Sequence, residues 1–343
     1  MKAAFIYPNP RTDILRAWER GDAPDGPLLG QNHMAEAGID AFVHDPALGG
    51  GGRVSWHLRE LTLPWELGRA DVAVTPLYRI FPPAARLRRG LKTVVLNYGF
   101  NVMLRHASRV RRSAEAAALH SPSRILCVAE SQRMQLLELT RLRAERVEVL
   151  RLGTDAAFFA PTNGEPVEDD FVLAVGKDFA RDYGTLVAAL GRSDVRVHLA
   201  CHPRNLVGVD LTETVTQALH EPSALRDLYA RAACIVLPQH GDDHPHGTEG
   251  GGLSALLEAM AMAKPIVATD RMVIREYVTD GESALLVPPE DPELLRSAVE
   301  RVLGDRNLAR RLGAAARARI DNGLTTKHMA LALAGTLHAV VDR

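Results

Sequence analysis

The chain has 343 residues, of which 46% are hydrophobic and 24% are charged, a composition typical of a globular protein. Its length is large for a single hydrophobic core and predicts two domains. The formal net charge of −1 excludes the strong overall positive charge on which nucleic-acid-binding proteins rely, so no nucleic-acid partner is expected.

The start of the chain, MKAAFIYP, is too short for a signal peptide and predicts a first β-strand. No apolar run approaches the length of a membrane span, so no integral membrane segment is expected. Cys127, Cys201 and Cys234 lie in or beside apolar runs far apart in the sequence. We interpret them as buried, reduced thiols, which indicates a cytoplasmic location.

Short apolar runs alternate with longer helical patterns along the first half of the chain. Helices are expected over residues 102–119 and 130–141. The basic run RHASRVRR (105–112) is interpreted as a solvated helix face, with nucleic acid or an anionic membrane as the alternative. The predicted strands are AAFIY, IDAFVH, DVAVTP, KTVVLNY, RILCVA and RVEVLRL.

The second half repeats this alternation. Helices are expected near residues 185–190, 223–233 and 253–262, and the chain beyond Pro292 is expected to be helical to its end. The predicted strands are FVLAVG, VRVHLAC, ACIVLP, KPIVAT and SALLVPP.

Strands that are apolar on both faces and separated by helices predict parallel sheets covered on both sides. The fold class is therefore α/β, with two Rossmann-like, doubly wound domains whose strand ends face a ligand-binding cleft. We expect an N-terminal domain over residues 1–160 and a C-terminal domain over 161–325. The segment 158–170 is interpreted as the linker, and residues 326–343 as a helix that returns to the first domain.

A dinucleotide-binding GxGxxG fingerprint is missing after the first strand. The glycine run LGGGGR (48–53) is interpreted as a surface loop, and a phosphate-binding loop is the alternative.

The stretch EGGGLSALLEAMA (249–261) follows a predicted strand and opens a predicted helix at Leu253. Glycines at a helix N-terminus let an anion approach the backbone N–H groups, where the helix dipole favours negative charge. Gly251, Gly252 and Leu253 are thus candidates for binding a phosphate or diphosphate. A plain glycine-rich turn is the alternative interpretation.

Glu258 lies inside this otherwise apolar helix, with Ser254 one turn earlier on the same face. An ionised carboxylate there is costly unless something hydrogen-bonds it. Hydroxyls of a sugar one turn from a phosphate would do so, as in dinucleotide-binding folds. An internal pair with a Lys or Arg is the alternative, and a nucleotide-type ligand is the interpretation we favour.

The block GLSALLEAMAMAKPIVATD, preceded by LYARAACIVLP and followed by IREYVTDGESALLVPPEDPELLRSAVERVL, resembles the C-terminal domain of retaining GT-B glycosyltransferases of family 4. The likeness covers residues 171–320. It is weaker in the first domain, where it rests on RILCVAESQ and VLRLGTDAAFFAP.

The resemblance implies a role for each matching residue. Glu258 would bind the ribose of a nucleoside diphosphate sugar, and the amides of Gly251, Gly252 and Leu253, with Ser254 nearby, would bind its diphosphate. Lys177 and Arg181, in AVGKDFARDYGTLVAAL, would neutralise the leaving diphosphate, so no metal or other cofactor is expected. For either cation, a surface ion pair is the alternative.

The sequence departs from the family pattern in two places. The family's first acid stands eight residues before its second, and that position here is Gly250, preceded by Glu249. Glu249 is the candidate for the first-acid role, and Asp243 or His246 could reach the sugar instead. A histidine that the family often carries after the fourth strand is also missing, and NY (97–98) stands in that neighbourhood.

Two further polar clusters are open to a functional interpretation. The loop HGDDHPH (240–246) has three histidines and two aspartates, for which a metal site is the alternative to a reshaped sugar-binding loop. Arg204 follows a predicted strand end and is a candidate for a minor donor contact.

The resemblance implies a glycosyltransferase that moves a sugar from a nucleoside diphosphate sugar to a small-molecule or saccharide acceptor with retention at the anomeric carbon. Attack on the front face of a tight ion pair is the implied mechanism. One alternative is a sugar-nucleotide epimerase or phosphorylase on the same fold. Another, prompted by the two departures, is a non-catalytic donor-binding subunit or pseudoenzyme.

Overall fold

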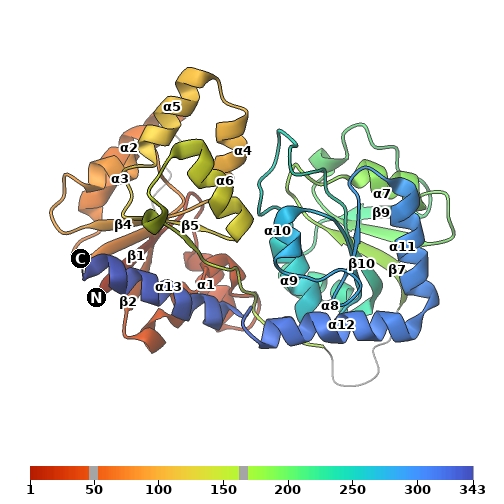
Figure 1. The fold of residues 1–343 in the computed structure, drawn as a ribbon. Coiled ribbons are helices and arrows are strands. Elements are labelled where there is room, and N and C mark those ends of the chain that lie inside the picture. Colours follow the sequence, from red (N-terminus) through yellow and green to blue (C-terminus); the bar gives the residue numbers. More distant parts are fainter. Residues whose placement is uncertain (46–52, 162–168, 343) are drawn as a thin grey trace. The chain divides into compact units, whose positions relative to one another are not determined.

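The structure is a computed structural model that describes residues 1–45, 53–161 and 169–342. It has two compact units, and each is built on a six-stranded, all-parallel sheet (Figure 1). The predicted α/β class, with two Rossmann-like units, is confirmed.

The sheet of the first unit has the strand order β2-β1-β3-β4-β5-β6. Its strands are β1 (Lys2–Ile6), β2 (Asp40–His44), β3 (Val72–Thr75), β4 (Lys92–Leu96), β5 (Arg124–Cys127) and β6 (Val147–Val149). Its helices are α1 (Thr12–Glu19), α2 (Arg53–Glu66), α3 (Phe81–Ala85), α4 (Phe100–Arg105), α5 (Arg109–Ala118), α6 (Glu130–Thr140) and α13 (Thr326–Val341), with short 3₁₀ turns between them.

The sheet of the second unit has the order β12-β11-β10-β7-β8-β9, which is the Rossmann order with β7 as its first strand. Its strands are β7 (Asp169–Val175), β8 (Arg196–Ala200), β9 (Val215–Ala218), β10 (Ala232–Leu237), β11 (Ile266–Thr269) and β12 (Leu285–Val287). Its helices are α7 (Tyr183–Leu190), α8 (Pro222–Arg231), α9 (Leu253–Ala261), α10 (Met272–Arg275), α11 (Pro292–Gly304) and α12 (Arg306–Asp321).

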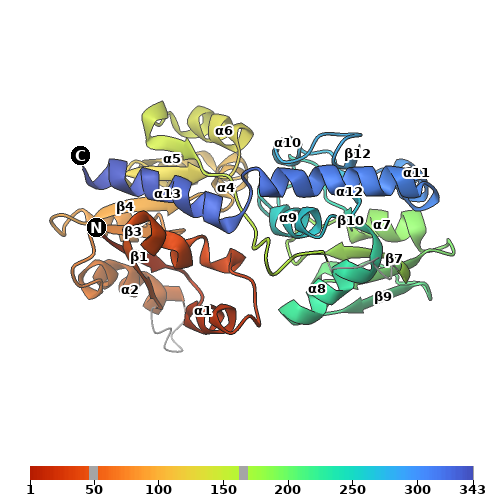
Figure 2. The same ribbon diagram turned by 90° about the horizontal axis from the view of Figure 1, so that it is seen from below.

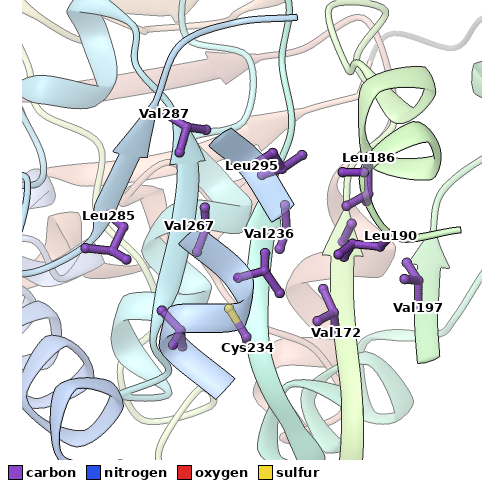
Figure 3. Close-up of a cluster of buried hydrophobic side chains, with 14 of the residues drawn as sticks. Val172, Leu186, Leu190, Val197, Cys234, Val236, Val267, Leu285, Val287 and Leu295 are labelled. Carbon is purple, nitrogen blue, oxygen red and sulfur yellow. The ribbon is translucent and has the colours of Figure 1, made fainter. Parts of the chain in front are cut away.

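The core of the second unit forms where alternate residues of the central strands meet α7, α11 and α12 (Figure 3). Val172, Cys234, Val236 and Val267 point into this cluster, and each is fully or almost fully buried. Their neighbours Leu173 and Ile235 are also fully buried, on the opposite face of the strands. Burial on both faces explains why these strands appear in the sequence as unbroken apolar runs.

The last helix, α13, belongs to the first unit, where it packs against the 3₁₀ segment Gln31–Ala37 and β4 (Figure 2). The second unit comprises Leu152–Thr325 together with the short segment Gly21–Pro24, and the chain returns to the first unit at Thr326. The sequence-based boundary lay after residue 160. An isolated bridge between Thr154 and Thr325 joins the start of the segment Leu152–Thr325 to its end.

Two sequence-based expectations need correction. The helix expected over residues 102–119 is two helices, α4 and α5, because Ser108 caps a new helix by accepting a hydrogen bond from the Arg111 amide. Strand β9 was not predicted, since it lies at the edge of its sheet and only its first residue is buried. Residues 46–52, which include most of the glycine run, and most of the expected linker lie outside the described residues.

All three cysteines are buried and unbridged. Within the described ranges, no helix has both the length and the apolar character needed to cross a bilayer.

Candidate active site

The predicted site residues gather at the carboxyl ends of β7 and β10, the two strands at which the order of the second sheet reverses. In the Rossmann order, ligands bind in the crevice beside this switch point. The segment after β7 carries Lys177 and Arg181, and the segment after β10 carries the glycines that precede α9. An antiparallel bridge between Arg181 and Gln239 joins the two segments.

Arg181 is the most unusual residue of this site, because its side chain is buried with only part of its hydrogen-bonding capacity used. The residue is 5% exposed, and its Nε and Nη1 atoms have no partner within the described part of the chain. Buried guanidinium donors without hydrogen-bond partners are destabilising. Arg181 is therefore the strongest indication of an anion-binding position here.

Gly176 makes room for this guanidinium. A Cβ atom at position 176 would lie 2.0 Å from Nε of Arg181 and 2.5 Å from its Cζ. The Gly176 carbonyl accepts a 2.8 Å hydrogen bond from the Tyr183 hydroxyl, which fixes the backbone on which the guanidinium lies. The first glycine after β7 is thus a steric requirement of the Arg181 position.

Lys177 lies in the same segment, but its side chain is exposed. Asn205 supports this segment through its Nδ2 atom, which lies 3.4 Å from the Lys177 carbonyl and 3.0 Å from the Asp178 carbonyl. Arg204 stacks its guanidinium over the Phe179 ring at 4.8 Å. Arg204 therefore lies beside the predicted site and contributes a second exposed cation there.

The glycines before α9 are required by packing between the two segments. A Cβ at Gly247 would lie 2.4 Å from Oδ1 of Asp178, and one at Gly251 would lie 2.8 Å from the same atom. Gly252 adopts φ +90°, and a Cβ there would lie 2.8 Å from Oε1 of Gln239. The glycine run thus has a structural cause that the sequence-based interpretation did not include.

Two of the amides assigned to the diphosphate take part in turns. The Gly251 amide donates to the Thr248 carbonyl at 3.0 Å, and the Leu253 amide donates to the Gly250 carbonyl at 3.2 Å. The next amides of the first turn of α9 lie before the point where intrahelical hydrogen bonds begin. The N-cap residue Gly252 has no side chain that could accept from them. Ser254, in this turn, is exposed.

Glu258 has an internal partner that the sequence reading missed. The hydroxyl of fully buried Tyr229, on α8, donates a 2.9 Å hydrogen bond to its Oε2 atom. Burial raises the pKa of Glu258 to about 7, against the opposing effects of the Tyr229 hydrogen bond and the Arg181 charge. Glu258 thus lies within the electrostatic reach of Arg181. The sequence offered one signal for this partner: Tyr229 lies four residues after Leu225, on the buried face of the predicted helix.

Glu249 is 5% exposed and lies at the turn before the glycines. The adjoining Thr248 hydroxyl lies 3.4 Å from Oδ2 of Asp178. The structure thus places Glu249 in the loop that packs against the Arg181 segment.

The histidine-rich loop forms a small stack beside this site. The His240 and His244 rings stack at 4.1 Å, and Nδ1 of His240 lies 3.0 Å from Oε1 of Glu290. Asp242 is used structurally, because it pairs with Arg271 and accepts from the Met272 amide at 3.0 Å. Among residues that the structure describes, no group of three or more His, Cys, Asp and Glu is arranged to hold a metal.

In the first unit, Asn97 and Tyr98 follow β4, in the neighbourhood where the resemblance implies a histidine. Asn97 is 2% exposed and accepts a 2.9 Å hydrogen bond from the Phe100 amide. Its Nδ2 atom donates to Oδ1 of the buried Asn101 at 3.2 Å. Asn97 is therefore part of a buried amide network, whereas Tyr98 beside it is 44% exposed.

Comparison with known proteins shows to which proteins this chain is similar. Residues 209–319 match the family model described as glycosyl transferases group 1. Among curated proteins, the chain is 28% identical over 240 residues to a D-inositol 3-phosphate glycosyltransferase of Frankia alni, covering 60% of this chain and 56% of that protein. It is 30% identical over 246 residues to an alpha-maltose-1-phosphate synthase of Mycolicibacterium smegmatis, covering 63% of each.

The chain spans about half the length of most of the curated relatives that it matches. Among solved structures, it superposes on Anabaena HepE in complex with UDP-glucose with a TM-score of 0.74 at 14% identity, over 99% of this chain and 100% of that one. That likeness establishes the fold. The family match over residues 209–319 lies within the second unit of this chain, and the fold is of the GT-B type.

Proposed function

We propose that the chain is a retaining, metal-independent glycosyltransferase that moves a sugar from a nucleoside diphosphate sugar to a small-molecule or saccharide acceptor. The observation that carries the proposal is the buried, under-coordinated Arg181 guanidinium within electrostatic reach of Glu258, at the switch point of a Rossmann-ordered sheet. A nucleoside diphosphate would supply both a diphosphate for the guanidinium and a ribose for the carboxylate.

The proposed chemistry uses these residues as follows. The bond between the anomeric carbon and the diphosphate oxygen breaks, and its electron pair stays on the diphosphate. Arg181, Lys177 and the N-terminus of α9 stabilise the charge that develops there. The acceptor hydroxyl then attacks the same face of the sugar, and its proton passes to the departing phosphate oxygen.

The names of the relatives support the choice of substrates. Anabaena HepE has been crystallised with UDP-glucose, and one curated relative is named for D-inositol 3-phosphate as its acceptor. A nucleoside diphosphate sugar and a hydroxylated small molecule or saccharide are accordingly the proposed partners. With nucleotide sugars as donors, the proposed location is the cytoplasm.

A thermal-shift panel of UDP-, GDP- and dTDP-sugars and their free diphosphates, each with and without EDTA, tests donor binding and its metal independence. We expect one base to raise the melting temperature in both conditions. NMR of the product, or of slow donor hydrolysis, should then give the same anomeric configuration as the donor. Donor binding without turnover in the presence of any tested acceptor would support the non-catalytic alternative.

Turnover that requires inorganic phosphate, or donor conversion without an acceptor, would support the phosphorylase or epimerase alternative. The proposal would be contradicted altogether if none of the donors binds and if Glu258→Ala leaves the melting temperatures in the same panel unchanged.

A further inference from the structure

A basic pocket lies in the first unit, whereas the proposed donor-binding residues belong to the second unit. Its volume is about 610 Å³, within the range of small-molecule sites. Lys92 and Arg124, which line it, are the first residues of β4 and β5. In a parallel sheet all strands begin at one edge, so the pocket lies at the edge opposite to Asn97. Its charged lining residues are Arg86, Arg88, Arg89, Lys92, Arg124, Arg143, Arg146 and Glu145.

Three of these cations already have partners. Arg124 pairs with Glu148, with 2.6 Å between Nε and Oε1. Arg88 donates to the carbonyls of Pro64 and Gly68, which fixes the loop after α2. Arg143 pairs with Glu145 at 3.4 Å. The two ion pairs neutralise part of the positive charge of the pocket, whereas the Arg88 contacts hold that side chain in place.

Arg86 and Arg146 differ from those three, because both guanidinium groups are held by the same carbonyl oxygen. The His120 carbonyl accepts from Nη2 of Arg86 at 2.7 Å and from Nη2 of Arg146 at 2.9 Å. Arg86 also donates to the Ser121 carbonyl at 3.1 Å, and Arg146 to the Pro122 carbonyl. In the residues that the structure describes, neither forms an ion pair with a carboxylate.

Two cations fixed on one carbonyl repel each other. Burial lowers the pKa of Arg146, and the charges of Arg86, Arg143 and Arg124 lower it further. The backbone carbonyls hold both guanidinium groups in place without neutralising either of them. Such a pair is preorganised for a ligand that brings more than one negative charge.

We propose that this pocket binds the phosphate groups of a multiply phosphorylated ligand, with Arg86 and Arg146 as the central contacts. Planar guanidinium groups present paired N–H donors that match phosphate oxygens, and each of these two has donor atoms left for a ligand. Arg89 and Lys92 line the same pocket and add charge. A soluble phosphate compound and a lipid headgroup share this chemistry.

Calorimetry with pyrophosphate tests the proposal in the Arg181→Gln variant of the full chain, which removes the proposed donor contact in the second unit. We expect pyrophosphate to bind at low salt and to bind more weakly as salt is raised. Adding Arg86→Gln and Arg146→Gln should weaken binding by about tenfold or more, whereas adding Arg109→Gln, at the far end of α5, should not. Hydrogen exchange should show ligand protection in residues 86–93 and 120–124.

A second pair of variants keeps the test decisive if the first pair does not fold. Arg89→Gln with Lys92→Gln leaves the carbonyl contacts intact and should weaken binding several-fold. Flotation with vesicles that contain cardiolipin, a lipid with two phosphates, against phosphatidylcholine vesicles, distinguishes the sources: vesicle binding that pyrophosphate displaces assigns a lipid headgroup, and its absence assigns a soluble ligand. Failure to bind either pyrophosphate or anionic vesicles, or binding that both pairs leave unchanged, would overturn the proposal.

Discussion

The Tyr229 hydroxyl donates a 2.9 Å hydrogen bond to Oε2 of Glu258, joining α8 to the carboxylate that we assign to the donor ribose. This bond lowers the pKa of Glu258, which burial raises to about 7. The carboxylate therefore changes its protonation state close to neutral pH. The protonation state of Glu258 thus depends in part on Tyr229, which belongs to a different helix.

Tyr229→Phe should remove this hydrogen bond while keeping the ring in the core. Because the bond favours the ionised carboxylate, its loss should raise the pKa of Glu258 and move the pH midpoint of donor binding upward. Unfolding free energy should fall by about 1 kcal/mol. Calorimetric titration of the donor from pH 5.5 to 8.5 measures the midpoint. An unchanged midpoint with weaker binding at every pH would argue against the role assigned to this bond.

Glu258→Gln should abolish the pH dependence of donor binding and should change the pH dependence of stability. Between the ordinary carboxyl pKa of 4.5 and the folded value of about 7, the native protein retains a proton that the unfolded chain releases. Wild-type stability should therefore fall as pH rises through this window, relative to the variant. The change should be at most about 3 kcal/mol, reduced by the partial exposure of the side chain. Urea unfolding of both proteins at pH 5 and pH 8 tests this difference. The prediction would be contradicted if the unfolding free energies of wild type and variant changed equally between the two pH values.

Gly176→Ala should displace the Arg181 guanidinium, because the new Cβ would lie 2.0 Å from Nε. We expect nucleoside diphosphate binding to weaken by about tenfold or more, as for loss of a charge-assisted contact. Gly184→Ala is the matched control, since its Cβ would lie at an ordinary 3.6 Å from the nearest atom and position 184 is in α7. Equal affinities for the two variants would show that Arg181 does not need this space.

His33 should make the stability of the first unit depend on pH. Its Nε2 atom lies 2.8 Å from Oδ2 of the buried Asp25, which also accepts a 2.9 Å hydrogen bond from Thr326 at the start of α13. The hydrogen bond to Asp25 is the main cause that raises the pKa of His33. For a histidine whose folded pKa is raised, the stabilisation is complete below the unfolded value and is lost as pH rises through the folded value.

His33→Gln should accordingly cost about 1 kcal/mol at pH 5.5 and less at pH 8.5. Chemical unfolding of both proteins at these two values measures the difference. A cost that stays constant over this range would indicate a role independent of the histidine charge.

Much of the fold was predictable because buried parallel strands appear in the sequence as apolar runs. Strand β9 escaped detection because an edge strand with one buried residue carries no such run. The break between α4 and α5 had a local signal, the capping serine at 108, which a basic, helix-forming context concealed. Both errors fall where side chains are only partly buried.

The site was predictable in its location but not in its internal contacts. The glycine run and the acid in an apolar helix indicated a ligand position at a strand end. The partner of Glu258 comes from another helix, and the glycines pack against Asp178 and Gln239, so both depend on tertiary contacts. The burial of Arg181 without a full set of partners is likewise a property of the folded chain alone.

The central claim is that Arg181 binds the diphosphate of the donor. Calorimetry should compare the preferred nucleoside diphosphate with the corresponding nucleoside, in wild type, in Arg181→Gln and in the exposed-residue control Arg192→Gln. We predict that Arg181→Gln weakens diphosphate binding by about tenfold to a hundredfold and leaves nucleoside binding unchanged, while Arg192→Gln alters neither. An equal loss for both ligands, or no loss for the diphosphate, would contradict the account.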